Sequence, residues 1–322
     1  MSEVMVIARK EIKDSLNNKF FLSILILLLI LTVVSIVLGT LQVHSQVAQY
    51  NKSIEFLKSM GKTNLPPMPS LNPLSVSKGF VNYVGMIGAL LAIVLGNYAV
   101  SKERKNGTFR LILSRSIYRD QLINGKLSGN LLLLALINFA IAAVTLISLS
   151  TLGGVSLSGV DITRLTFFFT ASFLYMSLFF VLSLFVTLLL PYKNYALLIV
   201  IIIWLVFAFI FPQIGDTMDM DNQLPGGFFA SMGMNRAQEQ QIVNKFKVYE
   251  TLRNGIEELS PTKHFERMSF ALLGVKPGFE NNTAWEIVKL KWLNLAGLLV
   301  PNILLSMLSY LVFLRRENIY ST

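Results

Sequence analysis

Six long runs of apolar residues constrain the fold of this chain more than any other feature. They cover residues 20–41, 80–100, 127–149, 165–190, 195–211 and 292–313, and none of them contains Asp, Glu, Lys, Arg or His. A helix needs about 20 apolar residues to cross the hydrocarbon core of a bilayer, which is about 30 Å thick. Five runs reach that length, and the run at 195–211 comes close. The sequence therefore predicts an all-α integral membrane protein with six transmembrane helices.

The composition agrees with a membrane protein. Charged residues make up 14% of the chain and hydrophobic residues 53%, whereas soluble domains have about 25% charged residues. The net charge of +10 is explained by the Lys and Arg residues that flank the cytosolic ends of membrane helices. We therefore expect a multi-pass protein of the cell membrane, with the lipid bilayer and no nucleic acid among its partners.

The distribution of Lys and Arg predicts the topology. If the N-terminus is cytosolic, the cytosolic segments carry 14 of these residues and the short outer segments carry 5. The long segment 212–291 is left out of the comparison, because loops beyond about 60 residues cross the membrane largely regardless of charge. Both termini are therefore expected inside, with segments 42–79 and 212–291 outside. Pro212 is expected to end the fifth span.

Residues 1–19 have the pattern of an amphipathic helix. Val4, Ala8, Ile12 and Leu16 follow one another at a spacing of four, which places them on one face. This pattern predicts a helix that lies on the inner membrane surface with its apolar stripe in the lipid. The alternative is a polar tail that precedes the first span. We divide the chain into this helix and a six-span domain at 20–322.

The segment between the second and third runs, residues 103–126, is basic and too polar to lie in lipid. It reads ERKNGTFRLILSRSIYRDQLINGK and resembles the cytosolic coupling segment of ABC-2 type transporter permeases. Phe109 stands where that family usually has Leu, and Ser116 where it usually has Pro. The positions that carry the resemblance, with Phe109, form the candidate coupling site: Glu103, Gly107, Thr108, Phe109, Leu111, Leu113, Ser114, Arg119, Gly125 and Lys126.

The resemblance implies the membrane subunit of an ATP-driven exporter, with an N-terminal elbow helix and a coupling helix at 103–126. It also implies two copies of a separate soluble ATPase, which would hold ATP and Mg, and a second permease chain in a homodimer. In that reading Phe109 and Leu113 fill a groove on the ATPase, while Glu103 and Arg119 anchor the segment. The alternative is a basic loop that only sets the topology.

The sequence contains no motif for catalysis or for metal or cofactor binding. Gly125 and Lys126 are followed by Leu127, so the phosphate-binding loop that ends in Gly-Lys-Ser or Gly-Lys-Thr is missing. The two histidines, His44 and His264, do not form a metalloprotease motif. We therefore expect no enzymatic activity and no cofactor in this chain. Two other functions stay open: a transmembrane scaffold or sensor that binds an extracytoplasmic partner, and a secondary carrier, which the charge-free runs disfavour.

Asparagines are the most polar side chains near or within the apolar runs. They can form hydrogen bonds between helices or line a polar translocation path. The six candidates are Asn82, Asn97, Asn130, Asn138, Asn294 and Asn302.

The two outer segments are expected to contain helices. Segment 42–79 begins with a polar helical stretch and ends in a proline-rich stretch. In segment 212–291, apolar residues at spacings of three and four predict a helix over about 235–259, which Ser260 and Pro261 end. A shorter helix follows. These amphipathic helices need a partner surface, which can be this chain's own outer cap, a second permease or an outside protein. The carboxylates of Asp216, Asp219 and Asp221 are expected to form a solvated turn and not a cation site.

Overall fold

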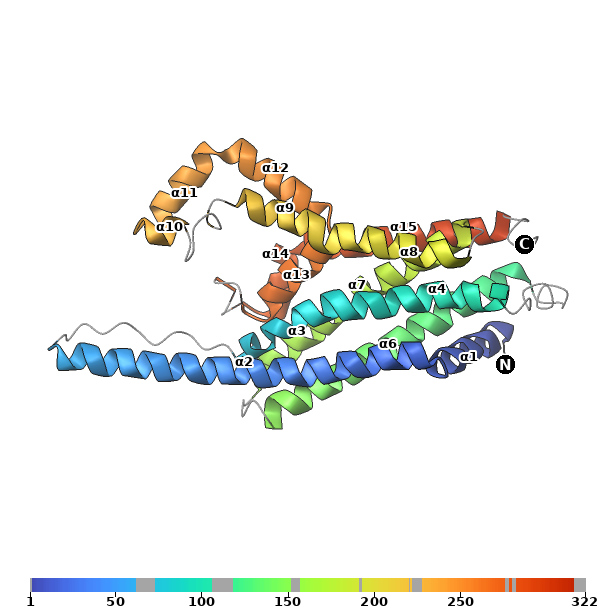
Figure 1. The fold of residues 1–322 in the computed structure, drawn as a ribbon, viewed down its shortest axis with the longest axis horizontal. Coiled ribbons are helices and arrows are strands. Elements are labelled where there is room, and N and C mark those ends of the chain that lie inside the picture. Colours follow the sequence, from blue (N-terminus) through green and yellow to red (C-terminus); the bar gives the residue numbers. More distant parts are fainter. Residues whose placement is uncertain are drawn as a thin grey trace.

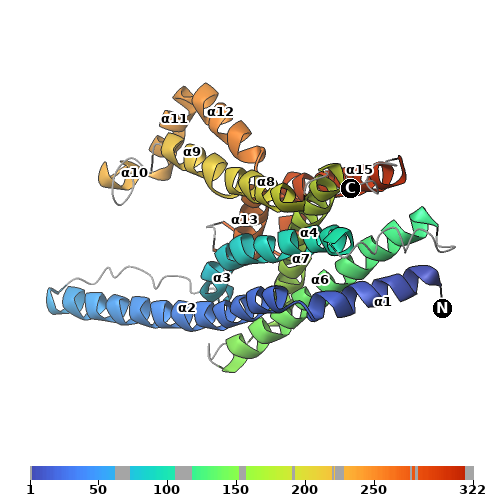
Figure 2. The same cartoon turned by 45° about the vertical axis from the view of Figure 1, so that its right-hand side comes forward.

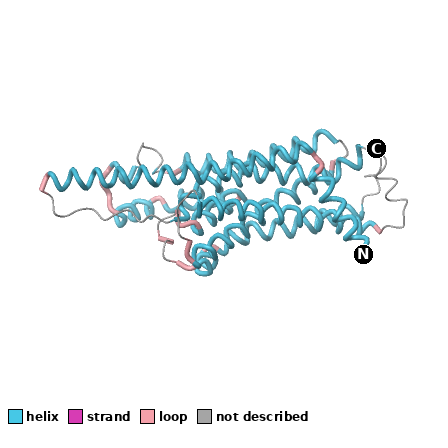
Figure 3. The backbone as a smooth tube through the Cα atoms, turned by 90° about the horizontal axis from the view of Figure 1, so that it is seen from below, coloured by secondary structure: helices cyan, strands magenta, loops and turns pink. Residues whose placement is uncertain are grey.

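The computed structural model describes residues 2–61, 73–105, 118–151, 157–190, 193–219, 221, 228–275, 278–279 and 282–315. Over these residues the regular elements are all helices, and six helical segments are long and apolar enough to cross a membrane. They form an elongated bundle in which the N-terminal helix and the end of the last helix lie at the same end (Figures 1 and 3). The predicted all-α, six-span fold is confirmed.

The second and fifth spans are each assembled from consecutive helical pieces, and the other four are continuous. The spanning elements are α2 (Lys19–Ser59); α3 (Lys78–Tyr83), η2 (Val84–Gly88) and α4 (Ala89–Lys105); α6 (Arg119–Thr151); α7 (Gly159–Leu189); α8 (Lys193–Leu205), η3 (Val206–Ile210) and α9 (Phe211–Met218); and α15 (Trp292–Arg315). A short turn, η1 (Pro73–Ser77), precedes α3.

The fourth span, α7, is the centre of the bundle, and it packs mainly against α4 and α15. Its contact with α4 is close because Gly96 has no side chain: a Cβ there would lie 2.3 Å from the carbonyl oxygen of Phe180. Next to it, the Ser183 hydroxyl donates a hydrogen bond to the carbonyl of Ile93 at 2.7 Å. Small residues thus bring these two helices together without a hydrophobic driving force from water.

The first span does not stop where its apolar run ends. Helix α2 continues beyond Leu41 through residues 42–59, so the predicted polar helix and the span are one element. This extension projects far beyond the rest of the bundle at the end opposite the termini (Figure 1).

The prediction that Pro212 ends the fifth span was wrong. The helix runs on through α9 to Met218, with Pro212 in the first turn of α9. A proline lacks an N–H and its ring clashes with the carbonyl of the preceding turn. The π-helical turn η3 directly before it widens the backbone, which lets the chain accept the proline without leaving the helix.

Segment 212–291 folds into α9, α10 (Phe228–Ser231), α11 (Arg236–Lys245), α12 (Lys247–Glu258), α13 (Pro261–Leu272) and α14 (Ala284–Leu290). The helix predicted over 235–259 begins at its Asn235 cap, but it bends at Phe246 into two helices (Figure 1). Helix α12 packs on α9, and its Arg253 pairs at 3.2 Å with Asp219, which caps the C-terminus of α9. Helix α11 buries none of its described residues.

Helix α13 is inserted among the ends of the spans that lie opposite the termini. The Ser260 hydroxyl caps it and also donates to the Phe207 carbonyl in η3. Phe265 stacks on Tyr175 of α7 with ring centroids 4.6 Å apart, and the Tyr175 hydroxyl donates to Gly85 in η2 at 2.8 Å. The shorter helix predicted after Ser260 and Pro261 is confirmed, and it packs within the chain.

Candidate functional site

The N-terminal helix α1 (Glu3–Leu16) packs along α6, as Figures 1 and 2 show. Gly125 and Gly129, four residues apart on α6, make the contact. A Cβ at Gly125 would lie 2.6 Å from the Cβ of Ile7, and a Cβ at Gly129 would lie 2.7 Å from the Cα of Ala8. Glycines at this spacing allow two helices to approach until their backbones touch.

The face of α1 that turns inward carries charge. Ile7, Glu11 and Ser15 are its buried residues, whereas Leu16 of the predicted lipid-facing stripe is exposed. The most buried face is therefore shifted from the predicted stripe, and it packs on protein. The reason is that Glu11 meets cations from two other helices, which stabilises a buried carboxylate.

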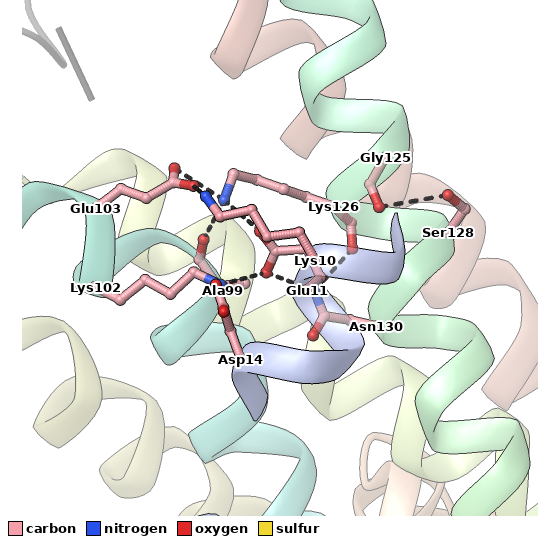
Figure 4. A network of polar contacts seen from close by, with 10 residues as sticks. All are labelled: Lys10, Glu11, Asp14, Ala99, Lys102, Glu103, Gly125, Lys126, Ser128 and Asn130. Carbon is pink, nitrogen blue, oxygen red and sulfur yellow. Dashed lines mark hydrogen bonds and ion pairs between the residues drawn. The ribbon is translucent and has the colours of Figure 1, made fainter. Parts of the chain in front are cut away.

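Lys126 on α6 is the central cation of a network of polar contacts (Figure 4). Its side chain is fully buried. Its ammonium nitrogen lies 3.0 Å from an oxygen of Glu11 and 2.9 Å from an oxygen of Glu103 at the end of α4. It also donates a hydrogen bond to the carbonyl of Ala99 at 2.7 Å. Three partners match the three N–H donors of an ammonium group.

A second lysine extends the network. Lys102 lies 2.9 Å from Glu11 and 3.0 Å from Asp14, and Lys10 lies 3.5 Å from Glu103. The amide of Asn130 adds a hydrogen bond to the carbonyl of Lys126 at 2.8 Å. We call the six charged residues the ion-pair cluster: Lys10, Glu11, Asp14, Lys102, Glu103 and Lys126 (Figure 4).

The ion-pair cluster has no net charge, because it contains three cations and three carboxylates. Burial raises the pKa of the Glu11 carboxyl, but the ammonium groups of Lys126 and Lys102 lower it by more than burial raises it. The resulting pKa is below the ordinary value of 4.5. Glu11 is therefore ionised at neutral pH. Removing one partner from such a buried set leaves an uncompensated charge, which is strongly destabilising.

The end of α4 is also joined to the end of α7. The Arg104 guanidinium donates to the carbonyls of Thr187 at 2.9 Å and Leu190 at 2.8 Å. Asn97 donates to the Thr187 hydroxyl at 3.1 Å. Carbonyls in the last turn of a helix lack partners within it, so a cation there is favourable. The end of α4 is thus tied to α1, α6 and α7 together.

A family model described as ABC-2 family transporter protein matches residues 5–318. The chain belongs to the ABC-2 transporter family. The match includes α1 from Met5 onward, the candidate coupling segment and all six spans.

Two curated relatives agree with this assignment. The chain is 30% identical over 153 residues to the probable ABC transporter permease protein NosY of Pseudomonas aeruginosa, which is 46% of this chain and 47% of that protein. It is 30% identical over 150 residues to the protein of the same name from Stutzerimonas stutzeri, or 45% and 46%. The matched region spans about half the length of the curated relatives.

The structure brings together only the two ends of the candidate coupling site in this ABC-2 chain. Glu103, Gly125 and Lys126 lie at the junction of α1, α4 and α6, where Glu103 is 2% exposed. Arg119 begins α6 and donates to the carbonyl of Leu314 in α15 at 3.4 Å. The remaining residues of the site lie outside the described part of the chain: Gly107, Thr108, Phe109, Leu111, Leu113 and Ser114.

Five of the six candidate asparagines form hydrogen bonds between or along helices. Asn138 donates to the Phe169 carbonyl at 2.7 Å and Asn302 to the Leu174 carbonyl at 3.0 Å, so both bind α7. Asn294 meets the ring of His264 at 3.0 Å. Asn97 and Asn130 belong to the contacts described above. Asn82 is exposed and lines a pocket at the other end of the bundle.

Sequence reasoning missed Glu11 and Lys102 as members of a buried site. The pattern of residues 1–19 predicted a helix on the membrane surface with its apolar stripe in the lipid, and this prediction assigned Glu11 no partner in the protein. One signal was present: Glu11 lies four residues from Ile7 and from Ser15, so it shares their helical face. The sequence around Lys102, Glu103 and Lys126 did not indicate that these residues pair with one another or with Glu11, because ion pairs between helices depend on the fold.

Proposed function

We propose that this ABC-2 protein is the permease of an ATP-driven exporter whose ATP is hydrolysed by a separate soluble subunit. The observation that carries the proposal is the position of the ion-pair cluster. Glu103 lies just before residues 106–117, and Lys126 closes the segment that resembles the coupling segment of the family. Lys126 pairs with Glu103 on α4 and with Glu11 on α1, so a displacement of the segment acts on α1, α4 and α6 at once.

In this proposal the residues of the chain transmit force and perform no chemistry. ATP and Mg bind the partner ATPase. The segment 103–126 docks on that ATPase, two permease chains pair with two ATPase chains, and ATPase closure moves the spans. The proposal also places both termini in the cytosol of a cell-membrane protein, as the excess of Lys and Arg indicates.

The test is to purify the chain alone and together with a soluble ATPase expressed from the same cells. We expect no ATP hydrolysis by the chain alone and vanadate-sensitive hydrolysis by the complex. The complex should lose this stimulation when Leu113 is replaced by Ala. Hydrolysis by the chain alone, verified free of other proteins, would contradict the proposal.

A second function is favoured by one observation, the projection of α2. Residues 42–59 extend the first span beyond the bundle, and this extension exposes Phe56. A transmembrane scaffold would use such an arm to hold an extracytoplasmic partner. The same purification separates the two functions, since a scaffold would retain an external protein and no ATPase.

A further inference from the structure

A pocket of about 460 Å³ lies between α2 and α3, at the end of the bundle opposite the ion-pair cluster. Helices α2 and α3 lie side by side there (Figures 1 and 2). The polar lining comes chiefly from Gln42 and Gln46 on α2 and from Lys78 and Asn82 on α3. These four side chains are exposed, so the pocket opens to the surroundings.

Two glycines build the floor of this pocket. A Cβ at Gly39 would lie 2.1 Å from the carbonyl oxygen of Val76, and a Cβ at Gly79 would lie 2.9 Å from the hydroxyl oxygen of Ser35. The backbone of η1 and α3 therefore rests directly on α2. The longer side chains of the lining extend on either side of this contact between α2 and α3, and the space between them is the pocket.

The pocket lies at the level where the apolar runs end. Gln42 follows the last residue of the first run, Leu41, and Lys78 precedes the first residue of the second run, Phe80, by two positions. Leu38 lines the pocket and is 55% exposed, and Leu41, three residues farther along α2, is 60% exposed. The polar lining of the pocket thus adjoins exposed apolar side chains of α2.

The described lining of the pocket carries positive charge. Among the residues that the structure describes, Lys78 is the one charged residue that lines the pocket, and no carboxylate lines it. Over residues 20–102 the sequence has a single acidic residue, Glu55, which lies farther out on α2. A lone lysine beside amide groups provides N–H donors for an anion with several acceptor oxygens.

We propose that this pocket binds the phosphate-bearing headgroup of an anionic phospholipid. The ammonium group of Lys78 faces the phosphate, and the amides of Gln42, Gln46 and Asn82 bind the remaining headgroup oxygens. The acyl chains run along Leu38 and Leu41. A lipid fits better than a free phosphate ester because the polar site and an exposed apolar surface are continuous. The site is independent of ATP coupling.

The experiment measures retained lipid by native mass spectrometry after graded removal of lipid in detergent. The proteins are the wild type, Lys78→Gln, Lys78→Arg and the control Lys52→Gln, which removes an exposed lysine farther along α2. We expect Lys78→Gln to retain about tenfold less phosphatidylglycerol than the wild type, or a larger loss, as the removal of a charged hydrogen bond predicts. Lys78→Arg and Lys52→Gln should retain it. Equal retention by Lys78→Gln and Lys52→Gln would overturn the proposal.

Two further arms identify the occupant. Asn82→Phe fills the pocket without a change of charge, and it should also reduce retention while the melting temperature stays the same. Phosphatidylcholine should be retained less than phosphatidylglycerol by the wild type, because it lacks a net negative charge. Displacement of the bound lipid by millimolar sn-glycerol 3-phosphate would show a site for soluble phosphate esters and would overturn the assignment to a lipid.

Discussion

The carboxylate of Glu11 lies 3.0 Å from the ammonium nitrogen of Lys126, across the contact between α1 and the third spanning helix. This pair joins an element outside the spans to the end of the candidate coupling segment. Both side chains are buried, so the pair is shielded from solvent and salt.

The first prediction concerns the energy of the ion-pair cluster. Glu11→Ala leaves Lys126 and Lys102 with fewer carboxylates in a buried site, which should cost about 3–5 kcal/mol of stability. The loss is measured as a lower melting temperature in detergent. Lys13→Ala, on the exposed face of the same helix, is the control and should change it little. Equal melting temperatures for the two variants would show that the ion-pair cluster does not hold α1.

The second prediction concerns the contact of α1 with α6. Gly129→Ala places a methyl group where only 2.7 Å separates it from the Cα of Ala8, so α1 must move away. Ser15 is 1% exposed, and a cysteine at this position should react slowly with a maleimide. We expect faster labelling of Ser15→Cys when Gly129→Ala is added. Ser128→Ala, at the exposed neighbouring position, should leave the labelling rate unchanged.

The third prediction concerns pH. Because the pKa of Glu11 is lower in the folded protein than its ordinary value of 4.5, ionised Glu11 stabilises the fold above that value. This contribution is lost as the pH falls through the lowered pKa. The melting temperature of the wild type should therefore exceed that of Glu11→Gln at pH 7 and pH 5. The difference should shrink below pH 4.5, and a difference that grew instead would reverse the assigned sign.

Particular residues show how far the sequence alone could lead. Runs without charge identified the six spans because the requirement for about 20 apolar residues is local. The path through Pro212 could not be read from the sequence, because it depends on a π-helical turn that forms in the context of α13. The partner of Lys126 was equally hidden. Lys126 is 115 positions from Glu11, and only the packing of α1 against Gly125 and Gly129 brings them together.

The fourth prediction concerns topology. If both termini are cytosolic, Ser53→Cys on the extension of α2 and Ser231→Cys at the end of α10 should react with an impermeant maleimide in intact cells. Both positions are exposed in the structure, and the chain has no native cysteine. Ser114→Cys should react only after the cells are opened. Labelling of Ser114→Cys in intact cells would contradict the assignment of the termini and this segment to the cytosol.

The last prediction concerns the coupling segment. Phe109 and Leu113 are proposed to fill a groove on the ATPase, and removing a buried apolar side chain costs about 2–4 kcal/mol by analogy with core truncations. Arg115 is proposed to lie at the rim, where the loss of a charge costs about 1 kcal/mol or less. Phe109→Ala and Leu113→Ala should therefore weaken co-purification of the ATPase more than Arg115→Ala does.

Glu103 needs a different measurement from these three residues, because its carboxylate pairs with Lys126 at 2.9 Å inside the protein. Glu103→Gln should lower the melting temperature of the chain purified alone. Phe109→Ala and Leu113→Ala should not, if their side chains contact the ATPase and not the bundle. A double variant, Phe109→Ala with Leu113→Ala, that bound its ATPase at wild-type affinity would show that residues 106–117 do not dock there, and the segment would then only set the topology.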